Sequence, residues 1–157
     1  MKIIKTQYPR LARGVLLAGL LAWPAAANDP APEVLIKAGH WKRARPLVEQ
    51  RYQANPGDAR SAYLLSQVKA AFGDLDAAVP LAEKAVALDS NNADYHAQLG
   101  VVCGETAEKA SLFAKAGWAH RFKEETEKAA ALDPKNLDAR FALLEFYLRA
   151  NLSLIHI

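Results

Sequence analysis

Two stretches of the sequence decide the fold: Gly39–Pro46, which reads GHWKRARP, and Gly73–Pro80, which reads GDLDAAVP. The glycine, the alanine at the sixth position and the proline of the second stretch each follow their counterparts in the first by 34 residues. Pro56 and Ser90, which close the segments after these stretches, are also 34 residues apart. A fixed period of this length is typical of repeat proteins, in which stacked units share one core.

On both sides of these stretches, the apolar spacing predicts helices at 32–38, 41–54, 58–72, 75–88, 92–110, 116–132 and 137–150. Four residues stand where helix N-caps are needed, namely Asp58, Asp74, Asn92 and Asn136. We expect Pro46 and Pro80 in the first turns of their helices, where a missing N–H costs little. Small residues at Ala44, Ala78 and Gly100 would let paired helices approach, and Leu65, Leu99 and Leu143 would fill the core between them.

With these positions the sequence resembles the tetratricopeptide repeat (TPR), a 34-residue pair of antiparallel helices. The matching residues are Gly39, Gly73, Ala44, Ala78, Ala85, Ala129, the pair Leu99-Gly100, Pro56 and Pro134. The resemblance covers about residues 32–150. It implies an all-α fold, a right-handed α-solenoid of antiparallel helix pairs with about 3.5 repeats, and a role in binding proteins.

The third repeat is longer than the others. Ser90 and Pro134 are 44 residues apart, so ten extra residues lie within 104–121. We expect the first helix to run on and Gly117, or the residues just before it, to supply the turn. This stretch resembles an extended helix pair in a group of exported bacterial TPR proteins. Phe113 and Trp118 could contact a partner; the favoured interpretation is that they pack on each other and on the neighbouring repeat.

The N-terminus is typical of a secretory signal peptide. Residues 1–13 carry four bases and no acid, residues 14–23 are apolar, and Ala25-Ala-Ala27 offers an exit for signal peptidase. The apolar run has 10 residues, whereas a membrane-spanning helix needs about 20. We expect cleavage after Ala27, no stable membrane anchor thereafter, and a periplasmic or secreted protein; an uncleaved anchor is the alternative.

Charge argues against a nucleic-acid partner. The 157 residues carry 20 bases and 17 acids, but four of these bases lie in 1–27. The remaining chain has 16 bases and 17 acids, and no basic cluster remains that could neutralise a run of phosphates.

The C-terminus ends in Leu152-Ser-Leu-Ile-His-Ile157 after a stretch that has the pattern of the first helix of a fourth repeat. These six residues are what the codons of a transposon-end adaptor used for sequencing libraries would encode. We therefore expect domains at 1–27 (signal peptide) and 28–151 (TPR-like repeats), with 152–157 a non-native tail on a truncated fragment. A genuine apolar tail is the alternative.

Catalytic and metal-binding patterns are weak in this sequence. Cys103 and His96 share a helix face, but they are seven residues apart, about 10 Å along the axis, which is too far for proton transfer. The spacing of His40, His96 and His120 indicates no metal site, and no nucleotide or hydrolase motif occurs. We expect no enzyme activity, no cofactor and no metal.

Binding is the better candidate, in the concave groove that the first helices of TPR pairs line. Mapping the family's groove positions gives Arg60, Tyr63, Gln67, Asp94, Ala97, Gln98, Val101, Asp138, Phe141 and Glu145. Relatives that hold a peptide carboxylate use Lys and Asn there, whereas this chain has Tyr63, Gln67 and Gln98. The sequence therefore predicts an exported scaffold for an unidentified protein or peptide partner, with Tyr63 and Phe141 as aromatic anchors. The alternative is an accessory module of a longer exported enzyme.

Overall fold

The computed structural model describes residues 30–155, and side chains through residue 148, which form seven α-helices and no strand. The helices are α1 (Pro32–Lys37), α2 (Trp41–Ala54), α3 (Ala59–Ala71), α4 (Leu75–Leu88), α5 (Ala93–Lys109), α6 (Leu112–Leu132) and α7 (Leu137–Ile155). The all-α solenoid expected from the sequence is confirmed. The expected signal peptide at 1–27 lies outside the described residues.

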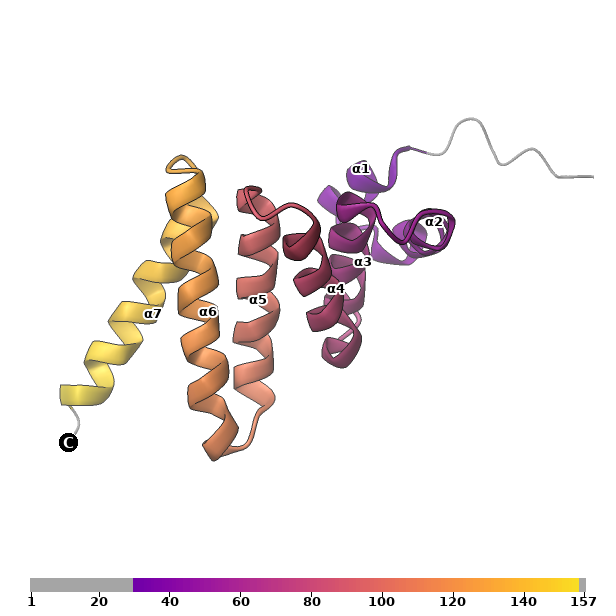
Figure 1. Ribbon diagram of the computed structural model, residues 1–157. Helices are drawn as coiled ribbons and strands as arrows, with labels where there is room; N and C mark the ends of the chain where they lie inside the picture. The colour runs from indigo at the N-terminus through magenta and orange to yellow at the C-terminus, as the bar shows by residue number, and fades with distance from the viewer. Residues whose placement is uncertain (1–29, 156–157) are drawn as a thin grey trace, which may run out of the picture.

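The helices form successive antiparallel pairs, α1 with α2, α3 with α4 and α5 with α6, and α7 follows on α6 (Figure 1). Each helix packs mainly on its neighbours in sequence, and α3 also contacts α5, the first helix of the next pair. The first helices of successive pairs therefore lie on one side of the stack. This arrangement places the groove residues of α3 and α5 on a common surface.

Two glycines close the turns that define the period. Gly39 and Gly73 have φ of 73° and 77°, a backbone region that is open to glycine and strained for other residues. In both turns the glycine N–H and the N–H after it donate to carbonyls of the preceding helix, in the 2.7–3.0 Å range. The equal offset of the two glycines thus reflects one turn used twice.

All four expected N-caps are confirmed: the side chains of Asp58, Asp74, Asn92 and Asn136 each accept a backbone N–H of the following helix. The placement of the two prolines was wrong. Pro46 and Pro80 stand at the sixth residue of α2 and α4, beyond the first turn. Both are exposed, so water can solvate the carbonyl that each leaves without a helical donor.

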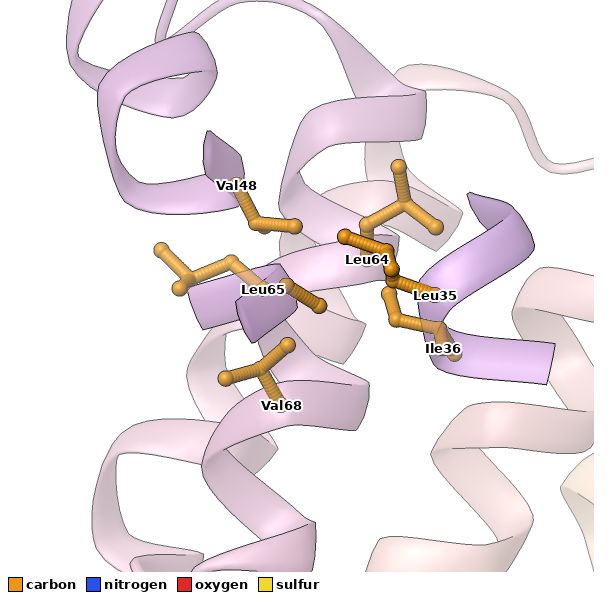
Figure 2. Packing of buried hydrophobic residues seen from close by; sticks show 7 residues of the cluster. Leu35, Ile36, Val48, Leu64, Leu65 and Val68 are labelled. Carbon is orange, nitrogen blue, oxygen red and sulfur yellow. The ribbon is translucent and has the colours of Figure 1, made fainter. Parts of the chain in front are cut away.

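The core between α1, α2 and α3 is built from branched aliphatic side chains. Figure 2 shows Leu35 and Ile36 of α1 and Val48 of α2 directed toward Leu64, Leu65 and Val68 of α3. Ala44 is fully buried beside them, which lets α2 approach closely. Leu65 and Leu99 are buried as expected, whereas Leu143 of α7 is only partly buried.

The extra length of the third pair lies in its helices. The helices α5 and α6 have 17 and 21 residues, against 13 and 14 for α3 and α4. The expected turn at Gly117 was wrong, because the chain turns at Ala110 and Ser111, both in extended backbone with negative φ. Such a turn needs no glycine, and Gly117 lies inside α6. Figure 1 shows the closed end of this pair reaching past the α3–α4 turn.

The last helix runs further than the sequence predicts. The expectation was a helix over 137–150, whereas α7 continues to Ile155 and so crosses the boundary drawn at Asn151. The helix rests on α6 through ring contacts, with centroids of Phe122 and Phe146 at 5.6 Å. Residues 156–157 of the expected tail lie outside the described part, and the origin of the tail stays a prediction.

Candidate functional site

The centre of the candidate groove is an aromatic pair that joins α3 to α5. The rings of Tyr63 and Tyr95 lie 5.1 Å apart at 40°, with Tyr95 buried and Tyr63 partly buried. Gln67 donates to the Tyr63 hydroxyl at 2.8 Å, which fixes the ring on the groove side of α3. Burial, followed by the negative charge of Asp94, raises the pKa of Tyr63. The phenol therefore stays neutral in neutral solution.

Arg60, at one end of the groove, is already engaged by α1. Its Nε donates to Oε1 of Glu33 at 2.9 Å, and the same oxygen accepts from Arg51 of α2 at 3.0 Å. Burial opposes the charge of Glu33, but the hydrogen bond from Arg60 and the two positive charges outweigh it, so the pKa of Glu33 is lowered. No sequence pattern indicated Glu33, because it lies 27 residues before Arg60.

The expected groove residues of α5 divide into surface and interior. Asp94 is exposed, Ala97 is partly buried and Val101 is 45% exposed. Gln98 is buried and donates to Ser66 Oγ at 3.3 Å, so its place in the groove is corrected to an interior hydrogen bond between α5 and α3. Glu105 lies four residues beyond Val101 on the same face, and burial raises its pKa. The sequence mapping missed this carboxylate.

The α7 residues of the expected groove lie on a different support. Asp138, Phe141 and Glu145 are exposed, with Phe141 at 64%. Their helix is held by α6, where Glu127 Oε1 accepts from the Tyr147 hydroxyl at 2.6 Å and Phe122 contacts Phe146. Tyr63 and the helix that carries Val101 are held instead by contacts between α3 and α5. We therefore restrict the candidate site to those two helices.

The thiol and imidazole of α5 do not form a catalytic pair. Cys103 is fully buried, and burial raises the pKa of its thiol to about 11. His96 is also buried, with Nδ1 at 2.6 Å from Glu125 Oε2 of α6 and Nε2 at 3.0 Å from the Ser90 carbonyl. Both side chains hold α5 in place, which agrees with the structural role expected for Cys103. Glu125 was not foreseen.

The two aromatic residues of the extension have different surroundings. Trp118 packs against the core formed by α4 and α5, and the Arg121 guanidinium lies 5.9 Å from its ring centroid. Phe113 is 95% exposed and its neighbour Leu112 is 83% exposed. The expected packing of Phe113 on Trp118 was wrong, because the turn at Ala110 and Ser111 places Phe113 at the start of α6, at the far end of the pair.

Over residues 30–155, no group of His, Cys, Asp and Glu side chains is arranged to hold a metal ion. Within the same residues, no helix combines the length and the hydropathy that crossing a bilayer requires.

Family comparison places two models on the chain. A tetratricopeptide-repeat model matches residues 35–101. The model described as regulator of microtubule dynamics protein 1-3 matches residues 73–155, more than half of the chain, and includes the extended α5–α6 pair. Among curated proteins, none matches the sequence.

Solved structures support the same fold. TTC0263, a thermophilic TPR protein in Thermus thermophilus, is similar with a TM-score of 0.69 and 16% identity, over 76% of this chain and 62% of that one. The first TPR of Spaghetti (RPAP3), bound to the HSP90 peptide SRMEEVD, gives 0.62 and 15% over 76% and 87%. MamA 41-end from Desulfovibrio magneticus RS-1 gives 0.51 and 29% over 65% and 54%.

The chain thus spans about three fifths of the length of the Thermus protein and about half of the MamA structure. The repeat period, the paired helices and the two family models agree along residues 35–155. The protein is a tetratricopeptide-repeat protein and belongs to the family described as regulator of microtubule dynamics protein 1-3.

Proposed function

We propose that this protein is an exported scaffold that binds a segment of another protein on the surface shared by α3 and α5. The observation that carries the proposal is the partly buried ring of Tyr63, held by Gln67 and Tyr95, on the same side of the stack as the exposed Val101. A fixed aromatic ring beside an apolar side chain gives a partner a rigid place to bury its own apolar atoms.

Family membership and neighbouring structures support this proposal at the level of fold. The solved TPR of Spaghetti holds a peptide, which is a property of that protein. TPR proteins serve in general as non-catalytic scaffolds, and the described residues of this chain supply no catalytic pair at Cys103 and His96. Protein binding is therefore better supported than catalysis.

Site-specific photo-cross-linking tests the surface. A photo-cross-linking amino acid is placed at Val101, at Glu124 on the exposed face of α6, or at Phe113, and each protein is irradiated in a periplasmic extract. We expect one partner to cross-link at Val101 and to be lost when Tyr63→Ala is added. Equal cross-linking at Glu124, or cross-linking at Val101 that persists in the Tyr63→Ala variant, would show that the partner binds elsewhere. Circular dichroism checks that each variant is folded.

Export is a separate part of the proposal, supported by the charge and apolar pattern of residues 1–27. The full chain is expressed in a bacterium, and the periplasmic and cytoplasmic fractions are analysed by mass spectrometry. We expect a periplasmic product that begins at Asn28. A full-length product confined to the cytoplasm would contradict export, and an uncleaved product in the membrane would favour the anchor alternative.

A second candidate function is an accessory module of a longer exported enzyme. The outer side of α7 presents an apolar face against which a further repeat or domain could pack, with four side chains that are 53–64% exposed: Leu137, Phe141, Leu144 and Leu148. Sequencing the genomic locus through the codons for residues 152–157 separates the possibilities. A reading frame that continues into further repeats supports the scaffold, and one that continues into a catalytic motif supports the enzyme. A natural stop codon after the codon for Ile157 would contradict the truncation hypothesis.

A further inference from the structure

We propose that the surface of α3 and α5 selects a positively charged, extended peptide whose two basic side chains bind Asp94 and Glu105 and whose apolar side chain between them contacts Val101. This inference rests on the function proposed above and adds the chemistry of the partner. It concerns the α3 and α5 surface alone, without α7.

The first observation is the sign of the charge along α5. Asp94, Glu105 and Glu108 are acidic and lie on the side that carries Val101, and Lys109, four residues beyond Glu105, is the base at the end of this side. Within residues 30–148, neither Asp94 nor Glu105 forms an ion pair with a base at salt-bridge distance. The nearest base along the helix, Lys109, has its ammonium by the α3–α4 turn, 3.8 Å from where a Gly73 Cβ would stand, and its charge acts on Glu105 without an ion pair at salt-bridge distance.

The second observation is that the base on the opposite wall is already neutralised. Arg60 of α3 is bound to Glu33 at 2.9 Å, and Arg51 pairs with both Glu33 and Asp58, so these two bases and two acids together carry no net charge. The groove therefore has a negative potential at both ends of the exposed α5 face, and a cationic ligand gains at each end. Burial raises the pKa of Glu105 and the charge of Lys109 opposes this shift, so a bound cation would further stabilise the ionised carboxylate.

The third observation is spacing. Asp94 and Glu105 are eleven residues apart, which is about 16 Å along a helix, and they share one face with Val101. An extended peptide covers this distance in about five residues at about 3.3 Å each. Between the carboxylates lie the 45% exposed Val101 and the partly buried Ala97, where a charged side chain would find no partner. The surface thus pairs two acidic ends with an apolar centre.

The fourth observation is the position of Tyr63. The charge of Asp94 acts on its phenol, so the ring lies beside the acidic end of the groove. A lysine or arginine bound at Asp94 can therefore also lie over the ring face, an arrangement that favours cations. The peptide in the Spaghetti complex, SRMEEVD, carries three acidic residues, and a peptide of that charge would be repelled from this surface.

The test uses short labelled peptides and the chain from Asn28 onward together with the full chain. The probe is the nonapeptide GKALAAKAG with fluorescein at its N-terminus, and its matched control is GEALAAEAG. We expect the lysine peptide to bind at least tenfold more tightly in fluorescence anisotropy. The double variant Asp94→Asn with Glu105→Gln should lose about tenfold in affinity and most of the salt dependence.

Glu124→Gln is the matched control, because it removes one carboxylate from the exposed face of α6 and should leave binding unchanged. Equal binding of the two peptides, or unchanged binding by the double variant, would overturn the charge preference. If both peptides bind equally and Tyr63→Ala abolishes the binding of both, the α3 and α5 surface does bind peptides. The proposed preference for a basic peptide is then wrong. If neither peptide binds at about 1 mM while cross-linking at Val101 succeeds, the partner is of another chemistry.

Discussion

The second and third helix pairs share one plan but differ in what their length contributes. The α3–α4 pair closes at Gly73 with a turn directly beyond its core, and its last buried layers include Val68 and Leu75. The α5–α6 pair is buried in its first half, where Leu99, Val102 and Cys103 face α4 and α6. Residues 111–117 at its far end are all exposed. Residues 111–117 therefore enlarge the surface without adding to the core.

The pairs also differ in what joins their helices. Ala62 of α3 is fully buried, and the residue 34 positions later is His96 of α5. His96 binds Glu125 of α6 and the Ser90 carbonyl, so a buried imidazole–carboxylate hydrogen bond occupies the place where the second pair has a methyl group. The Nε2 of His96 faces a carbonyl oxygen, which can only accept, so Nε2 donates there. This bond fixes the position of the longer pair near its open end.

The largest expected effect comes from breaking this bond. His96→Leu would leave the Glu125 carboxylate buried, with only Lys128 at 3.6 Å, and should lower the free energy of unfolding by about 3 kcal/mol. The double variant with Glu125→Leu should recover at least half of that loss, because no charge is then left buried. Urea unfolding followed by circular dichroism gives both values, and additive losses would show that the two side chains act independently.

The next effect compares the packed half of the α5–α6 pair with its solvent-exposed far end. The same change, glycine to leucine, is made at one position in each. A Cβ at Gly100 would lie 2.6 Å from Thr126 Oγ1, whereas a Cβ at Gly117 would meet nothing within 4 Å. We expect Gly100→Leu to cost about 2 kcal/mol by overpacking. Gly117→Leu should stabilise the protein by about 0.5 kcal/mol through helix propensity. Equal thermal shifts for the two variants would contradict the comparison.

A smaller effect follows from Cys103, which the second pair lacks. Its folded pKa of about 11 lies above the unfolded value of about 8.5, so the folded state keeps a proton that the unfolded state loses. The contribution to stability is therefore full below pH 8.5 and falls as the pH rises toward 11, by about 1.4 kcal/mol at pH 9.5. Unfolding midpoints of the protein and of Cys103→Ala are compared between pH 8 and pH 9.5. A constant difference would refute the assignment.

The smallest effect concerns the far end itself. Leu112 and Phe113 contribute exposed surface, so the double change to serine should alter the free energy of unfolding by less than about 0.5 kcal/mol. Trp118→Ala, which removes a ring packed against the α4 and α5 core, should cost about 2 kcal/mol and serves as the positive control. A large loss in the serine variant would mean that the tip packs on something in solution.

Much of the fold could be predicted from the period of 34, because it places the turn glycines and the caps without tertiary information. Local glycine chemistry misled the prediction for the extension. Gly117 suggested a turn, but two residues in extended backbone at Ala110 and Ser111 turn the chain instead, and α6 takes in the glycine. A turn whose residues have negative φ needs no glycine, so the amino-acid composition does not indicate it.

The candidate site was less predictable, because its chemistry depends on contacts between distant residues. The mapping found Tyr63 and Val101, whose exposure follows from the repeat position. It also included Gln98, which turned inward because Ser66 offers a hydrogen bond from the neighbouring helix. It could not find Glu33, which neutralises Arg60 from α1. Repeat position fixes which side a residue faces, while its charge environment comes from other helices.

The two turn glycines have a stereochemical consequence. At φ of 73° and 77°, Gly39 and Gly73 adopt the backbone that a d-amino acid prefers, the mirror image of the surrounding helices. A synthetic chain with d-alanine at both positions should therefore fold at least as stably as the natural one, whereas l-alanine should be strained at both. The repeat period is thus the distance along the chain between two residues at which the backbone φ changes from negative to positive.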